Sequence, residues 1–72
     1  MDKQKGTIRY WNGARGFGFI SQNRDGIAFS AFFHASQIVS GTPVVGAQCL
    51  FHEDTGKKGA IAKDVEVLGG VQ

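Results

Sequence analysis

Residues 15–20 read Arg-Gly-Phe-Gly-Phe-Ile, and the alternation of side chains in this stretch is typical of a β-strand with one face in the core. Successive side chains of a strand point to opposite faces, so Phe17 and Phe19 share one face. Gly18 and Ile20 share the other face, and Ile20 is the natural core residue. Two rings in water cost stability unless a ligand uses them. The reverse assignment, with both rings in the core, stays open because aromatic side chains are usually buried.

A second stretch, Ala31-Phe32-Phe33-His34, repeats this alternation. With Phe33 in the core, Phe32 and His34 form another exposed pair of flat side chains. If the two strands are neighbours, these side chains and the first pair of rings make a continuous platform. Nucleic-acid bases stack on such rings whatever their identity, and Arg15 next to the first pair can neutralise a phosphate. The pattern therefore predicts a surface that binds single-stranded nucleic acid.

The rest of the chain predicts short strands joined by tight turns. Eleven glycines fall between segments rich in aromatic and β-branched residues. No window carries a sustained helical repeat, and only a turn of 3₁₀-helix is expected, near Ser36-Ile38. Five strands are expected, over about residues 5–12, 16–22, 28–34, 47–53 and 60–68. Five short strands leave exposed edges unless the sheet closes, so the expected fold is an all-β barrel.

Length and composition favour a single binding domain over residues 1–72, with its core at about 5–68. A chain of 72 residues buries only about 60% of its unfolded surface and leaves little room for an enclosed catalytic cleft. No serine or cysteine has a recognisable base and orienting partner. We therefore expect a protein that is not an enzyme and needs no cofactor. Gly69-Gly70 is typical of a frayed end or the start of a linker.

Charge and cysteine content bear on partners and compartment. The net charge of +2 permits an anionic partner but does not demonstrate one. Cys49 is the only cysteine, whereas small secreted domains usually carry several. Cys49 and His52 fall on opposite faces of a strand, so no metal site is expected. No stretch approaches the roughly 20 apolar residues that span a membrane. We expect a cytoplasmic monomer without a membrane partner.

The two aromatic motifs, their order and the chain length resemble the cold-shock domain family. Residues 15–20 correspond to the family's first ribonucleoprotein motif, and residues 32–34 correspond to its second. The family's opening motif of a basic residue, two aromatics and Asn matches Arg9-Tyr10-Trp11-Asn12. Its basic-glycine turn matches Lys58-Gly59. The resemblance covers about residues 6–67, which is nearly the whole chain.

This resemblance implies a five-stranded antiparallel OB-type β-barrel that binds single-stranded RNA or DNA, often as an RNA chaperone. Carried over position by position, it assigns nucleic-acid contacts to Arg9, Tyr10, Trp11, Arg15, Phe17, Phe19, Phe32, His34 and Lys58. Strict alternation places Tyr10 on the same face as Ile8, a predicted core residue. The assignment of Tyr10 therefore requires a bend or bulge in the first strand, a feature common at barrel rims.

The chain also departs from the family pattern. The opening strand has Tyr-Trp where the family usually has Trp-Phe. Ala35 replaces an exposed Phe, and the loop around residues 41–43 lacks the aromatic that many members carry. Ala60-Ile61 replaces Pro-Gln, and Asp64 stands where Asn is common. Two stacking positions are thus missing, and at about 1–3 kcal/mol per stacked base their loss weakens binding.

Other functions are compatible with parts of this pattern. A protein-interaction β-barrel could dock a partner protein on the same aromatic face, and only nucleic-acid binding would depend steeply on salt. The chain could also be the nucleic-acid-binding end of a larger protein. The GxxG sequences at 13–16 and 56–59 lie in expected hairpins, whereas the RNA-binding GxxG loop must join two helices. The RNA-recognition motif needs two amphipathic helices, which this sequence lacks.

Overall fold

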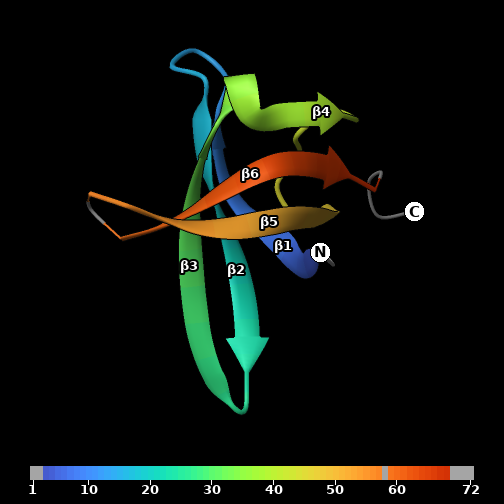
Figure 1. Cartoon of the computed structure of the whole chain (residues 1–72). Coiled ribbons are helices and arrows are strands. Elements are labelled where there is room, and N and C mark those ends of the chain that lie inside the picture. The colour runs from blue at the N-terminus through green and yellow to red at the C-terminus, as the bar shows by residue number, and fades with distance from the viewer. Residues whose placement is uncertain (1–2, 58, 69–72) are drawn as a thin grey trace.

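The computed structural model describes residues 3–57 and 59–68 and consists of strands and one 3₁₀ turn (Figure 1). Its elements are β1 (Gln4–Asn12), β2 (Phe17–Arg24), β3 (Ile27–His34), η1 (Ala35–Gln37), β4 (Ile38–Ser40), β5 (Gln48–Gly56) and β6 (Gly59–Val67). Each predicted strand is present, and β4 is a short addition. Among the residues described, there is no helix long and apolar enough to cross a membrane. The predicted frayed end at Gly69-Gly70 lies outside the described residues.

Five strands close into a barrel, which confirms the predicted fold. Their order is β3-β2-β1-β5-β6, and a parallel pairing of Phe32 with Ile61 joins β3 to β6. Strands that alternate in direction around a barrel of five must place two parallel strands next to each other. The sheet is therefore mixed at this closure rather than purely antiparallel. The short β4 pairs in parallel with β6 along the edge of β6 that lies opposite β5.

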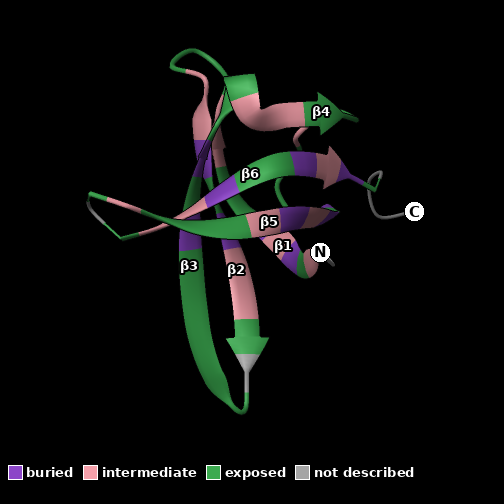
Figure 2. Cartoon of the chain, in the orientation of Figure 1, coloured by how far each residue is buried: buried purple, intermediate pink, exposed green. Residues whose placement is uncertain are grey.

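The core fills the barrel with inward-facing side chains from all five long strands. Buried segments interrupt these strands in Figure 2. The core residues are Ile8, Ile20, Ala31, Phe33, Ala47, Cys49, Phe51, Ala62, Val65 and Val67. Ile20 is buried and Phe19 is exposed, so the first of the two face assignments is confirmed. The Cys49 thiol lies 3.6 Å from the Gly6 carbonyl oxygen, and burial raises the pKa of Cys49 to about 11.

An inner aromatic stack crosses β2 at a glycine. Trp11 pairs with Gly18, and Gly18 pairs with Phe33, so these three residues form a row across β1, β2 and β3. Because Gly18 has no side chain, the Trp11 indole stacks on the Phe33 ring with centroids 5.5 Å apart and planes 12° apart. A Cβ at Gly18 would collide with the Tyr10 carbonyl oxygen and lie 3.0 Å from the Phe33 ring. A side chain at this position is therefore expected to destabilise the fold.

The β2–β3 hairpin projects away from the rest of the barrel (Figure 1). Its strands pair as far as Arg24 with Ile27, so Asp25 and Gly26 form a two-residue loop. Both loop residues have positive φ, 52° and 81°, as a type I′ turn requires. This tight turn keeps the two strands in register and extends the outer face of the sheet beyond the closed barrel.

The Gly18 row can be tested by matched Gly→Ala substitutions. Gly18→Ala should lower the free energy of unfolding by roughly 1–3 kcal/mol, because the added methyl group meets backbone that cannot move aside. Gly13→Ala is the control, since a Cβ there only touches the Trp11 indole nitrogen at 3.5 Å. It should be neutral or stabilising by up to about 1 kcal/mol. Urea unfolding followed by circular dichroism measures both, and equal midpoints would contradict the close approach at Gly18.

Candidate nucleic-acid interface

A bulge in β1 turns Tyr10 to the outside of the barrel. Ile8 pairs with Ile20, and Tyr10 pairs with Phe19, so Arg9 is an extra residue opposite β2. The bulge that the sequence requires in this strand is therefore present. Ile8 is fully buried, whereas the Tyr10 side chain is 43% exposed. The extra residue reverses the alternation between them.

Four rings gather on the outer side of β1, β2 and β3, and we call them the aromatic face: Tyr10, Phe17, Phe19 and Phe32. Tyr10 pairs with Phe19, and Phe19 pairs with Phe32, so three of the rings form a row across the sheet. Five pairs among the four rings have centroids 5.8–6.3 Å apart. Phe19 and Phe32 are each 38% exposed. Contacts among the rings stabilise them, and the exposed sides offer flat apolar surface.

His34 lies at the edge of the aromatic face. It pairs with Phe17 on the neighbouring strand and is exposed. Its Nδ1 accepts a hydrogen bond of 3.1 Å from the Ser36 backbone N–H and caps η1. The structure thus brings together three members of the predicted platform, places His34 beside Phe17, and adds Tyr10. The part that each plays in binding nucleic acid stays a prediction.

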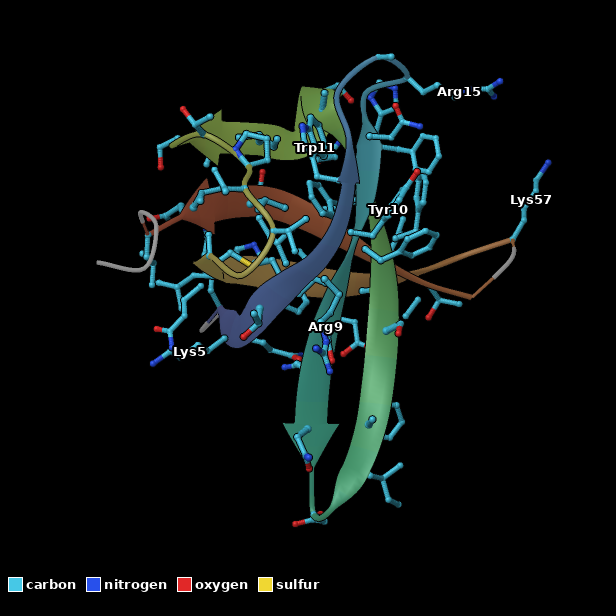
Figure 3. All side chains as sticks on the ribbon, turned by 180° about the vertical axis from the view of Figure 1, so that it is seen from behind. Lys5, Arg9, Tyr10, Trp11, Arg15 and Lys57 are labelled. Carbon is cyan, nitrogen blue, oxygen red and sulfur yellow. The ribbon has the colours of Figure 1, made fainter. Side chains whose placement is uncertain are left out.

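Trp11 lies apart from the aromatic face. Figure 3 shows its side chain on the other side of β1 from Tyr10. The indole is half-buried and packs on Phe33 in the core. This placement gives Trp11 a structural role, and its contact with nucleic acid stays a prediction.

Cations without ion-pair partners lie around the aromatic face. Arg9 is exposed at the bulge, and Arg15 extends from the turn between β1 and β2 (Figure 3). Lys57 is exposed in the turn between β5 and β6. Within residues 3–57 and 59–68, none of these three forms an ion pair. Lys58 lies outside the described residues, so its contact remains a prediction.

An open hollow of about 770 Å³ adjoins the aromatic face at the β3–β6 closure. Its lining residues are Phe19, Ser30, Phe32, Lys57, Gly59, Ala60 and Ile61. Sequence reasoning did not select Lys57, Ser30 or Ile61. Ser30 could have been found, because it lies two residues before Phe32 on the same face of a strand. Ile61 carries no polar signal and reaches the site only through its parallel pairing with Phe32.

The acidic groups on β5 and β6 are largely paired. Lys63 contacts the Asp54 carboxylate at 3.0 Å, and this hydrogen bond lowers the pKa of Asp54. Lys3 pairs with Glu66 and also donates to the Asp64 carbonyl oxygen at 2.8 Å. Among the described residues, no group of three or more His, Cys, Asp or Glu side chains could hold a metal ion.

Comparison with curated proteins finds a relative of similar length. The chain is 38% identical over 69 residues to the Cold shock-like protein CspA of Vibrio cholerae serotype O1. The similarity covers 92% of this chain and 96% of that protein. No protein-family model matches the chain. The similarity therefore extends over nearly the full length of both proteins.

Because Tyr10 lies on the outer face and Trp11 packs against the core, replacing each with Ala should lower the free energy of unfolding by different amounts. Trp11→Ala should lower the free energy of unfolding by roughly 2–4 kcal/mol, because it removes the stack on Phe33 and opens the core. Tyr10→Ala removes a partly exposed ring that lies outside the core and should cost about 1 kcal/mol or less. Thermal melts of the two variants provide the measurement. Equal losses would mean that Trp11 is not part of the core.

Proposed function

Because the chain belongs to the cold-shock protein family, we propose that it binds single-stranded RNA or DNA on the aromatic face and acts as an RNA chaperone does, not as an enzyme. The observation that carries this proposal is the outward row of Tyr10, Phe19 and Phe32, which Phe17 extends. A small domain keeps four rings partly in water here, at a cost in stability that a stacking ligand would offset. The cytoplasmic location and monomeric state stay predictions.

Base stacking would supply most of the affinity. Each base that stacks on a ring contributes about 1–3 kcal/mol and does so with little regard to base identity. The rings of the aromatic face are tilted relative to one another by 30–83°. A flexible single strand can turn successive bases to meet such rings, whereas a stacked duplex cannot. The proposal therefore favours single strands with weak sequence preference.

Phosphate contacts would come from the cations around the rings. Arg9 and Arg15 are exposed and form no ion pair with described residues, so neither must break an existing contact to bind a phosphate. We assign Lys58 the same role from its motif. We also assign this role to Lys57, which lines the hollow beside the aromatic face. Phosphate contacts position the strand without selecting its sequence.

Two features limit the affinity. Ala35 follows His34 where the family usually has a Phe, and its backbone N–H donates to the Gly16 carbonyl oxygen at 2.8 Å. No ring extends the aromatic face past His34 there, and the loop around residues 41–43 offers none either. We therefore expect weaker binding than in a member of the family that carries both additional rings.

Removing one ring should weaken binding without unfolding the protein. Phe32→Ala should raise the Kd for a pyrimidine-rich single strand about 5- to 150-fold, the equivalent of one lost stack. Its stability loss should stay well below the 3–5 kcal/mol or so that a buried Phe costs. Val39→Ala, which truncates an exposed apolar side chain on β4, is the control and should bind normally. An unchanged Kd for folded Phe32→Ala would contradict stacking on this ring.

The phosphate contacts predict a steep dependence on salt. With about three to five phosphates neutralised, log affinity against log salt should fall with a slope of about −2 to −3.5. Arg15→Gln should make the slope shallower by about 0.7 without changing base preference. Lys3→Gln is the matched control, because Lys3 already pairs with Glu66. Binding that is flat from low to physiological salt would favour a protein partner instead.

A further inference from the structure

A row of hydroxyl side chains lies next to the row of rings on the outer side of β1, β2 and β3. Thr7 pairs with Ser21, and Ser21 pairs with Ser30, so the three residues lie side by side across three strands. We call them the hydroxyl row. The adjoining row on the same strands points into the core and consists of Ile8, Ile20 and Ala31. Alternation therefore places the three hydroxyls on the outside.

The hydroxyl row continues the aromatic face without a break. Ser21 and Phe19 are two residues apart on β2, and Ser30 and Phe32 are two apart on β3, which separates the rows by about 6.6 Å. Ser30 and Phe32 also line the same open hollow. When one nucleotide stacks on Phe19 or Phe32, the next nucleotide of the strand can therefore reach the hydroxyl row.

The three hydroxyls are available to a ligand. Within residues 3–57 and 59–68, no side-chain hydrogen bond engages Thr7, Ser21 or Ser30. Each hydroxyl supplies an O–H donor. Serine and threonine hydroxyls are among the groups that donate to phosphate oxygens in nucleic-acid complexes. The row has no flat side chain, so it offers a base nothing to stack on.

The charges around the hydroxyl row favour an anion. Strands β1, β2 and β3 contain no Asp or Glu. Lys5 and Arg9 flank Thr7 on β1, both are exposed, and neither forms an ion pair with described residues. Figure 3 shows Arg9 and Lys5 following one another along β1, with Tyr10 beyond Arg9. In the described strands, carboxylates lie only on β5 and β6.

We propose that a strand bound on the aromatic face continues over the hydroxyl row, which binds its sugar–phosphate backbone rather than its bases. Thr7, Ser21 and Ser30 donate hydrogen bonds to phosphate oxygens, and Arg9 and Lys5 neutralise the phosphates. This inference rests on the proposed function and extends its site along β1. A docked protein is disfavoured because the row is polar and has no apolar anchor.

The test compares fluorescently labelled oligodeoxythymidylates of about 4 and about 10 nucleotides, within the range that OB folds cover. Anisotropy titrations at several salt concentrations give the slope of log affinity against log salt for each length. The slope is the readout, because a longer strand gains affinity simply from its larger number of binding registers. The long strand should show a slope steeper by about 0.7 for each additional phosphate bound.

Two variants and one control assign the additional phosphates. Lys5→Gln should remove about 0.7 from the slope of the long strand and leave the short strand unchanged. Ser21→Ala should weaken the long strand about 3- to 10-fold, the effect of one lost hydrogen bond. Lys3→Gln makes the same change in net charge two residues away, but Lys3 is paired with Glu66, so it should have little effect.

The outcomes separate this inference from the proposed function. Equal slopes for the two lengths would overturn the inference and leave binding on the aromatic face intact. A steeper slope for the long strand that neither Lys5→Gln nor Ser21→Ala alters would place the extra phosphates elsewhere and also overturn it. Failure of both lengths to bind would overturn the proposed function itself.

Discussion

The missing side chain at Gly18 allows β1, β2 and β3 to pack closely on the inner side of the barrel. It allows the Trp11 indole to reach Phe33 across β2, and a Cβ there would collide with the Tyr10 carbonyl oxygen. This stacked pair adds a side-chain contact between β1 and β3 on the inner side of the sheet. On the outer side of the same strands, Phe19 on β2 pairs with Phe32 on β3.

The bulge at Arg9 makes the inner stack compatible with an outer row of rings. Without an extra residue, Ile8 and Tyr10 would face the same way, and one of them would be misplaced. With it, Ile8 packs in the core, Tyr10 joins the aromatic face, and Trp11 returns to the inside. A single irregularity therefore serves packing and the exposed surface at once, which ties the stability of this small barrel to the geometry of its candidate site.

Period-two alternation was sufficient to predict the parts of the site that lie on regular strands. It placed Ile20 inside and Phe19 outside, and its disagreement with the family resemblance over Tyr10 indicated a bend or bulge in the first strand. It could not place Ile61, because that contact arises only when β6 closes the barrel against β3. Alternation also could not assign the face of Trp11, because the position of the extra residue in the bulge decides which way the following side chains point. The local sequence pattern predicts which face of a strand is exposed, whereas the closure of the barrel decides which residues of other strands lie beside that face.

The distribution of charge matters more for this surface than the net charge of +2. Lys3 and Lys63 are taken up by carboxylates on β5 and β6, so they contribute little field at the aromatic face. The cations of β1 face no carboxylate on β1, β2 or β3. Charge of one sign along a surface raises the local concentration of an oppositely charged ligand even when the total is small. A chain with a small net charge can thus carry exposed cations and no carboxylate on the three strands that also carry the rings.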